Sequence, residues 1–223
     1  MIPIDKPDSG LLEKLQSGAA QLGLPLTALQ SDQLLKYLSC LERWSTVHNL
    51  SAVAEQPAAL VRHVFDSMTL VEPLARYAAG KFQRVFDAGS GAGFPAAIIA
   101  VMQPTWFVMA ADSVAKKIAF IRQASHYAHI ENLVAIHKRV KDIRDQEGFD
   151  IIVSRAFNSL NSLVLQTAHL LAPNGIWVAQ KGQVPSHEIA HLDANCEVFH
   201  VEPVIVPALI GNRCLVWMRK ASQ

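Results

Sequence analysis

Residues 85–95 of the chain read Val-Phe-Asp-Ala-Gly-Ser-Gly-Ala-Gly-Phe-Pro, and this stretch decides the fold class. A strand-like apolar run ends in Asp87, three glycines alternate with small residues, and a helical run begins behind them. Glycine lets a backbone turn tightly and approach a ligand closely, and a helix N-terminus offers N–H groups with no intrahelical partner. The stretch therefore predicts a nucleotide-type site at the carboxyl edge of the first strand of an α/β sheet. The plain alternative is a tight strand–helix turn with no ligand.

Short β-prone runs alternate with helical runs beyond this stretch. Crossovers of this length imply parallel strand pairing, with helices on both faces of the sheet. The last two strands have no helix between them, and Gly211 and Asn212 predict a turn, so an antiparallel hairpin completes a mostly parallel seven-stranded sheet. The expected strands are Arg84–Ala88, Trp106–Ala111, Val134–His137, Asp150–Ser154, Gly175–Gln180, Glu197–Val206 and Cys214–Arg219, and the expected helices are Ala96–Met102, Ala115–Ala128 and Leu160–Leu171.

We expect residues 1–80 to form an N-terminal helical cap and residues 81–223 to form the α/β domain, in one compact unit. Apolar residues recur at helical spacing between residues 11 and 22 and again after Pro57. Thr27 and Gln30 have the spacing of a capping box, which opens a helix with an apolar stripe that includes Trp44. The stripe predicts that Trp44 packs in the core, and Asn49 is expected to cap its helix.

The composition excludes several classes of protein. With 51% hydrophobic and 17% charged residues, the 223-residue chain is too apolar to be disordered and long enough to bury a core. Its net charge of +1 excludes a globally basic protein that coats nucleic acid. A local basic patch remains compatible with that charge. Residues 138–144 carry an excess of three positive charges, and their place after the third strand makes them a candidate guide for phosphates.

Other features favour a cytoplasmic protein without a metal site or a membrane anchor. The first ten residues contain two acids and no apolar segment, unlike a secretory signal. The longest apolar run, Pro95–Met102, is far shorter than the ~20 residues that span a bilayer. Cys40, Cys196 and Cys214 form no C-x-x-C pair, and no histidine spacing is typical of a metal site. Nothing in the sequence suggests more than a monomer.

Two acids narrow the class of ligand. In the dinucleotide fingerprint G-x-G-x-x-G the third glycine would fall at Phe94, so the loop departs from that pattern. Asp112 ends the next strand about 20 residues further on, where a carboxylate suits the two hydroxyls of a ribose. Both NAD and S-adenosylmethionine carry such a ribose, but Asp87 suits a cationic or amino group better than a pyrophosphate. An NAD(P)-dependent oxidoreductase is therefore the alternative to an enzyme that uses S-adenosylmethionine.

A series of short motifs extends over nearly the whole chain. They are Leu41-Glu42-Arg43-Trp44, Asn49-Leu50-Ser51, Arg62-His63, Asp66-Ser67, the glycine loop, Asp112-Ser113, Lys116-Lys117, Ser154-Arg155-Ala156-Phe157 and Lys181-Gly182. In this order they make the sequence similar to the bacterial 16S ribosomal RNA guanine-N7 methyltransferases, once named glucose-inhibited division protein B. The resemblance implies a class I, Rossmann-like methyltransferase fold and S-adenosylmethionine as methyl donor. It also implies that the acceptor is a guanosine in the decoding-region loop of 16S rRNA, in naked RNA or in the 30S particle.

The resemblance also implies which residues bind the donor. Gly89, Phe94, Val140, Lys141 and Arg155 match family positions that contact it, and the loop itself adds Asp87, Gly91 and Asp112.

The loop departs from the usual family pattern, G-T-G-P-G-L-P-G, because Ala92, Phe94 and Ala96 replace a proline, a leucine and a glycine. Lys141 stands where the family usually has an acid. These departures support one further alternative to an active methyltransferase. In that alternative the chain is a ribosome-associated module that keeps the donor-binding fold as a vestige and has no catalytic activity.

Guanine N7 carries a free lone pair, so its attack on a methyl group needs no general base, and we expect no catalytic triad and no metal. The rate should come from positioning the base and from electrostatics that suit a purine as it becomes cationic. We expect Arg155, Arg62 and Lys181 to position the guanine. Arg62 and Asp66 lie four residues apart on a helix, so a local salt bridge is the alternative for this pair. The residues expected to contact RNA are Arg62, His63, Lys138, Arg139, Arg155 and Lys181.

Overall fold

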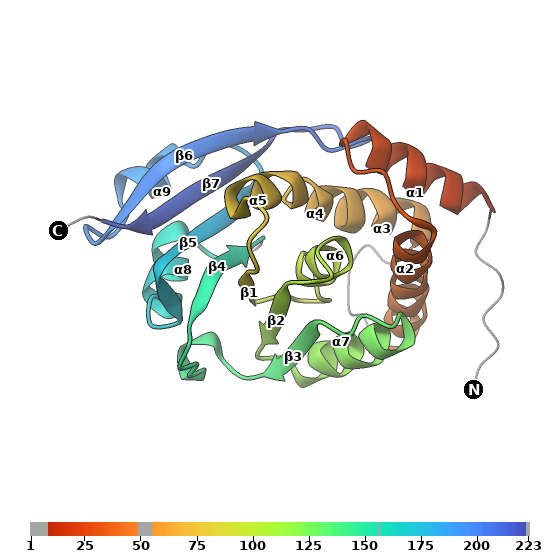
Figure 1. Cartoon of the computed structure of the whole chain (residues 1–223), viewed down its shortest axis with the longest axis horizontal. Coiled ribbons are helices and arrows are strands. Elements are labelled where there is room, and N and C mark those ends of the chain that lie inside the picture. Colours follow the sequence, from red (N-terminus) through yellow and green to blue (C-terminus); the bar gives the residue numbers. More distant parts are fainter. Residues whose placement is uncertain (1–8, 49–54, 156, 222–223) are drawn as a thin grey trace.

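A computed structural model of the chain describes residues 9–48, 55–155 and 157–221 (Figure 1). Its centre is a seven-stranded sheet of order β3-β2-β1-β4-β5-β7-β6. Strands β1 to β5 are parallel, while β7 runs antiparallel between β5 and β6. The expected mostly parallel sheet with a C-terminal antiparallel hairpin is therefore confirmed. The strands are β1 Arg84–Ala88, β2 Phe107–Asp112, β3 Leu133–His137, β4 Phe149–Ser154, β5 Leu171–Lys181, β6 Cys196–Val204 and β7 Arg213–Lys220.

The helices cover both faces of this sheet. The cap holds α1 Ser9–Gln21, α2 Ala28–His48, α3 Gln56–Ala59, the π-helix η1 Leu60–Phe65, α4 Asp66–Met68 and α5 Val71–Ala78. The crossover segments hold α6 Ala96–Met102, α7 Ala115–Tyr127, the 3₁₀ turn η2 Val140–Asp142, α8 Leu160–Thr167 and α9 Ser186–Ala190. The capping box before α2 forms as expected, because Thr27 N–H donates to Gln30 Oε1 at 3.0 Å and Gln30 N–H donates to Thr27 Oγ1 at 3.2 Å.

Of the listed strands and helices, only Arg84–Ala88 and Ala96–Met102 have the expected bounds; the others differ by one to four residues at one or both ends. Two of these differences have a clear cause. The helix expected to reach Leu171 ends at Thr167, because Phe149 N–H donates to Leu170 O at 2.8 Å and pairs with Leu171, which draws this segment into β5. The strand expected to begin at Trp106 begins one residue later, because the Trp106 N–H closes a turn onto Gln103 O. The short helix α9 was not predicted, whereas α5 lies within the residues 1–80 that were expected to be helical.

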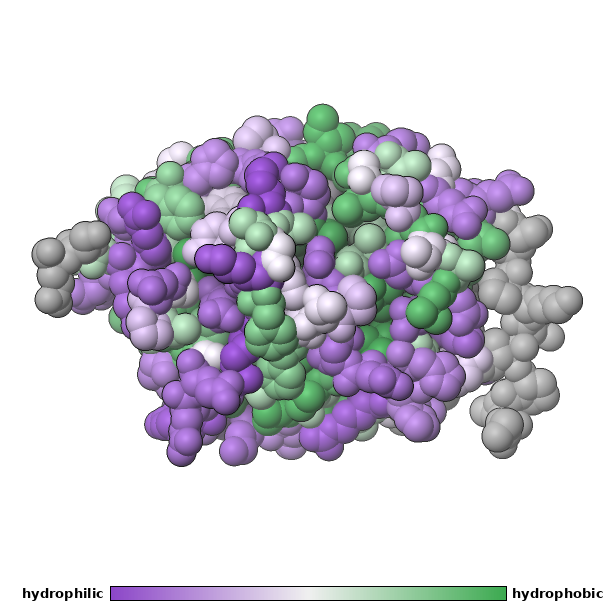
Figure 2. All heavy atoms as spheres, viewed as in Figure 1, coloured by the Kyte–Doolittle hydropathy of each residue, from purple (hydrophilic) through white to green (hydrophobic). Residues whose placement is uncertain are grey.

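Two buried clusters pack on the two faces of the sheet. One joins the cap helices to α6 and α7, with Leu38, Phe65 and Phe120 among its members. The other lies under α8 and includes Phe86, Leu163 and Trp177. The face drawn in Figure 2 is mostly hydrophilic, with hydrophobic areas between polar side chains. Trp44 is half-buried against the first cluster, as its stripe predicts.

The first cluster crosses the division expected at residue 80, because cap and sheet residues share it. The division into a cap of residues 1–80 and an α/β domain of residues 81–223, within one compact unit, stays a prediction. Within the described ranges, no helix is both long and apolar enough to cross a membrane.

Candidate functional site

The glycine loop leaves the carboxyl end of β1 and is fixed to the neighbouring strand β2. Ser90 N–H donates to Ala111 O at 3.0 Å, and Gly91 N–H donates to the Asp112 carboxylate at 3.1 Å. Gly91 has a φ of +59°, and a Cβ placed on it would meet no atom within 4 Å. The loop therefore presents open backbone at the sheet edge where the sequence places the donor site.

A cavity of about 270 Å³ lies beside this loop. It brings together residues from the ends of β1 and β2, from the η2 turn, from the segment after β4 and from α8. The residues that line it are Gly89, Asp112, Ser113, Arg139, Val140, Lys141, Phe157 and Gln166.

Four of these lining residues, Gly89, Asp112, Val140 and Lys141, were expected to bind the donor. Val140 is buried while Lys141 is exposed, so the pair forms one wall of the cavity with a charged outer rim.

Asp112 uses both of its carboxylate oxygens. Oδ1 accepts a hydrogen bond from Val114 N–H at 2.9 Å, while Oδ2 accepts from Gly91 N–H at 3.1 Å and from Lys117 Nζ at 3.3 Å. A carboxylate has about four lone-pair sites. A ribose hydroxyl bound here would take the remaining site or displace Lys117.

Asp87 is a buried carboxylate at the start of the loop. Its Oδ2 accepts the Ala96 N–H at 3.1 Å, at the N-terminus of α6, while its Oδ1 is buried without a hydrogen-bond partner among the described residues. Burial raises the pKa of Asp87 to about 7, against the opposing effects of the Ala96 N–H and the Arg155 charge. An orphaned acceptor of this kind suits a cationic amino group.

The cap buttresses the loop through Tyr37 of α2. The buried Tyr37 hydroxyl donates to Ala92 O at 3.0 Å. Gly93 has a φ of +80°, and a Cβ at this position would collide with that hydroxyl. The third glycine of the loop is therefore required by packing against the cap.

Phe94 is buried at 3% exposure and packs beneath the cap. Its ring meets Tyr37 edge-on at 5.5 Å and stacks on His63 with centroids 4.9 Å apart and planes at 16°. The Arg155 guanidinium lies 5.8 Å above the same ring. Phe94 does not line the cavity described above, so its expected contact with the donor stays a prediction.

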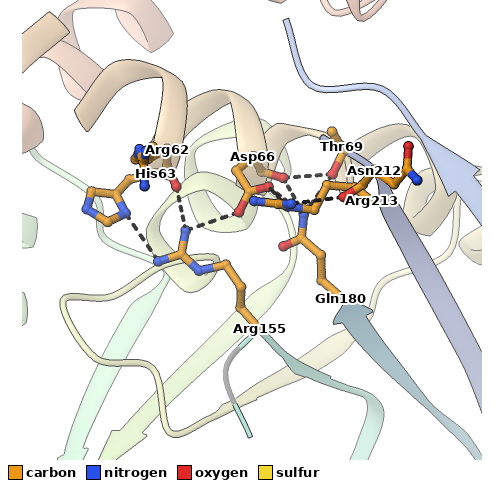
Figure 3. Close-up of polar contacts among 8 residues, drawn as sticks. All are labelled: Arg62, His63, Asp66, Thr69, Arg155, Gln180, Asn212 and Arg213. Carbon is orange, nitrogen blue, oxygen red and sulfur yellow. Dashed lines mark hydrogen bonds and ion pairs between the residues drawn. The ribbon is translucent and has the colours of Figure 1, made fainter. Parts of the chain in front are cut away.

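Arg155 follows β4 and reaches up to the π-helix η1 (Figure 3). Its Nη1 donates to Arg62 O at 3.1 Å and its Nη2 contacts His63 Nδ1 at 3.2 Å. In a regular α-helix the Asp66 N–H would bond Arg62 O, but here it bonds Val61 O and His63 O. The π geometry thus releases the Arg62 carbonyl to accept from Arg155. Burial lowers the pKa of Arg155 below its ordinary value, and the charge of Asp66 opposes that change.

The suggested local salt bridge between Arg62 and Asp66 does not form. Asp66 is buried and pairs with two arginines that are distant in sequence, Arg155 after β4 at 3.6 Å and Arg213 at the start of β7 at 2.8 Å. The Arg62 side chain is exposed and contributes its carbonyl to the network. The four-residue spacing was misleading because the π-turn changes which side chains face each other.

The basic residues expected to contact RNA occupy different positions along the sheet edge. Arg139 and Lys141 line the cavity, and Lys138 is exposed beside them. Lys181 ends β5 and pairs with Glu188 at 2.9 Å, so an RNA phosphate there would compete with that carboxylate. Arg144 donates to Lys141 O at 2.8 Å and to Ile143 O at 2.7 Å, and it does not line the cavity.

The family model for rRNA small subunit methyltransferase G (GidB) matches residues 30–216 of the chain. The Ribosomal RNA small subunit methyltransferase G of Leptothrix cholodnii is 46% identical over 210 residues, covering 94% of this chain and 96% of that protein. Its counterpart from Methylibium petroleiphilum is 45% identical, with 94% and 95% covered. The chain belongs to this family.

Solved structures share the fold of this methyltransferase at low sequence identity. TrmN from Thermus thermophilus has a TM-score of 0.54 at 18% identity, over 73% of this chain and 53% of that one. The glycopeptide N-methyltransferase MtfA, complexed with S-adenosyl-L-methionine, has a TM-score of 0.58 at 10% identity, over 72% and 96%. The expected class I, Rossmann-like methyltransferase fold is confirmed.

Asn49, which was expected to cap its helix, and Ala156 of the Ser-Arg-Ala-Phe motif lie outside the described residues. Three residues that line the cavity were not predicted as site residues. Phe157 and Ser113 line the cavity and stand in motifs that were noticed, so their motifs were the available signal. Gln166 reaches the cavity from α8, and no local pattern marks it. Within the described ranges, no cluster of three or more His, Cys, Asp or Glu residues is placed to hold a metal.

Proposed function

We propose that this chain transfers a methyl group from S-adenosylmethionine to N7 of a guanosine in the decoding-region loop of 16S rRNA. The observation that carries the proposal is one sheet edge that joins a loop-side cavity to Arg155 and to exposed basic residues, in a chain of the methyltransferase G family. The relatives' name supports a small-subunit ribosomal RNA as substrate.

The residues at this edge fit S-adenosylmethionine. Asp112 would hold the ribose hydroxyls, and Val140 with Lys141 would frame the adenine through the cavity wall. The unpartnered Oδ1 of Asp87 would accept from the amino group of the methionine tail. Gly89 and Gly91 leave the backbone accessible along the loop. When bound, this cofactor supplies a methyl group activated by a sulfonium.

The chain's own part in the reaction is positioning. Guanine N7 attacks without loss of a proton, so no residue has to act as a general base. We expect Arg155, Arg62 and Lys181 to position the guanine so that N7 lies about 3–3.5 Å from the methyl carbon. Arg139, Lys138 and His63 would extend the contact to neighbouring phosphates and bases. We expect the chain to act as a monomer in the cytoplasm.

Incorporation of label from tritiated donor tests the proposal. Undermethylated 16S rRNA and 30S particles are incubated with the chain, and the label in RNA is counted. We expect label in at least one of these substrates and a loss of label with Arg155→Ala. Asp145→Asn is the matched control, because Asp145 pairs with Arg84 beside the amino end of β1, away from the site. Donor binding without labelled RNA would favour the non-catalytic module.

Binding calorimetry separates the donor from a dinucleotide. S-adenosylhomocysteine is expected to bind and NADH is not. The reverse result would contradict the methyltransferase proposal and favour the oxidoreductase alternative.

A further inference from the structure

Asp66 is shared between two arginines that come from different parts of the sheet (Figure 3). Its Oδ1 accepts a hydrogen bond from Arg213 Nε at 2.8 Å, whereas its Oδ2 lies 3.6 Å from Arg155 Nη1, too far for a hydrogen bond. The carboxylate is therefore tightly bound to one arginine and loosely paired with the other.

The carboxylate itself is held in place by its surroundings. Gln180 Nε2 donates to Asp66 Oδ1 at 3.3 Å and to the Asp66 backbone O at 2.7 Å, and it contacts Thr69 Oγ1 at 3.1 Å. Thr69 Oγ1 also donates to the Asp66 backbone O, at 2.7 Å. Gln180 lies on β5 and is 2% exposed. Asp66 thus has a fixed position between the π-helix and the sheet.

Arg213 begins β7, just after the turn at Gly211 and Asn212, and its Nη1 donates to Asn212 O at 2.9 Å. It does not line the cavity and no motif marks it. Its Nε occupies Asp66 Oδ1, the oxygen that also accepts from Gln180 Nε2 at 3.3 Å.

Two arginines compete for one carboxylate, and the outcome fixes Arg155. Arginine prefers a bidentate pair with a carboxylate, in which both oxygens accept. With Oδ1 already taken by Arg213, Arg155 keeps only the longer contact to Oδ2, and its hydrogen bonds go to Arg62 O and to His63 instead. The Arg155 Nε donates to no residue in the described part of the chain.

We propose that Asp66 and Arg213 are positioning residues that hold Arg155 in place for methyl transfer, Arg213 by preventing Arg155 from closing onto Asp66. The inference rests on the proposed function of Arg155. Without Arg213, the guanidinium of Arg155 moves onto both Asp66 oxygens and leaves the Arg62 carbonyl.

Kinetics of single and double variants test this role. Arg213→Gln is expected to lower kcat by up to about 100-fold, since a misplacement of about 1 Å can cost that much. The affinity for S-adenosylhomocysteine should stay within about twofold, because Arg213 does not touch the cavity. Arg213→Lys, which keeps the charge and one donor, should recover part of kcat. In an Arg155→Ala background, Arg213→Gln should cause no further loss beyond about twofold.

A full further loss of kcat in the Arg155→Ala background would overturn the proposal, because Arg213 would then act independently of Arg155. So would a loss of donor affinity that accounts for the whole effect. Asp66→Asn is expected to behave like Arg213→Gln, but it removes a buried carboxylate. Arg213, with 27% of its side chain exposed, carries the test if Asp66→Asn does not fold.

A structural readout keeps this test apart from the proposed function. The guanidinium ¹⁵N–H signals of Arg155, assigned by their absence in Arg155→Ala, report its hydrogen bonds without any turnover. We expect Arg213→Gln to shift these signals while Asp145→Asn leaves them unchanged. If wild-type protein labels no RNA, the proposed function fails, yet a shift still supports the arrangement around Asp66. Unchanged Arg155 signals in Arg213→Gln would overturn the inference whatever the activity.

Discussion

The glycine loop contains two glycines with different physical roles, and their substitution by alanine separates these roles. Both have positive φ, +59° for Gly91 and +80° for Gly93. An alanine at such an angle costs about 1–2 kcal/mol at either position. Only at Gly93 does the new Cβ also collide with the Tyr37 hydroxyl, which must leave Ala92 O.

The difference in stability follows from that collision. Loss of a buried hydrogen bond with its acceptor left unpaired costs about 1–3 kcal/mol. Gly93→Ala should therefore destabilise the chain by about 2–5 kcal/mol, and Gly91→Ala only by the strain. A domain of this size loses about 2–4 °C in Tm per kcal/mol. Scanning calorimetry should show a fall of about 4–20 °C for Gly93→Ala, clearly larger than for Gly91→Ala.

Tyr37→Phe supplies the control. Alone it should cost about 0.5–1.5 kcal/mol, the net value of one hydrogen bond. It also removes the atom that the Cβ of residue 93 would strike, leaving close contacts of 3.3 Å to the ring carbon and 3.2 Å to Ile121 that small shifts relieve. Gly93→Ala should then cost less in the Tyr37→Phe background than in the wild type. Equal losses at the two glycines, or an unchanged cost in that background, would refute the packing role of Gly93.

Three further predictions concern Asp87, Asp112 and Thr27. Because the pKa of Asp87 rises from 3.8 to about 7 on folding, the folded state binds more protons between these values, so stability falls as pH rises from about 4 to 7. Asp87→Asn should flatten this part of the Tm-against-pH curve, and a slope identical to that of the wild type would assign the titration elsewhere. Asp112→Ala should weaken S-adenosylhomocysteine binding by about 10- to 100-fold in calorimetry, the equivalent of one charged hydrogen-bonding group; unchanged affinity would remove Asp112 from the donor site. Thr27→Ala should lower stability by about 1 kcal/mol through loss of the capping box and leave methyl transfer unchanged, whereas a loss of activity would connect the start of α2 to the site.

Local signals allowed much of the fold to be predicted. The Thr27 capping box, the glycine loop and the alternation of strands and helices all depend on residues a few positions apart, and each formed as expected. The C-terminal end of α8 was predicted wrongly, because Phe149 on β4 pairs with Leu171 and this contact joins segments that are distant in sequence.

The site residues that lie at the ends of strands or within recognisable motifs could be predicted from the sequence. Gly89, Asp112, Val140 and Lys141 meet at one cavity because parallel strands end at one edge. The network around Asp66 was not predictable, because its partner Arg213 lies 147 residues away and competes with Arg155 through geometry alone. The π-turn that frees the Arg62 carbonyl also has no local sequence signal, since its residues satisfy ordinary helical spacing.

The position of the transferred methyl group tests the central claim most directly. Undermethylated 30S particles or 16S rRNA are treated with the chain and S-adenosylmethionine, and the RNA is digested and analysed by mass spectrometry for 7-methylguanosine. We expect one new 7-methylguanosine, in a fragment from the decoding-region loop, that is lost with Arg155→Ala and kept with Asp145→Asn. A methyl group on another atom or in another region of the RNA, or none despite measured donor binding, would contradict the claim.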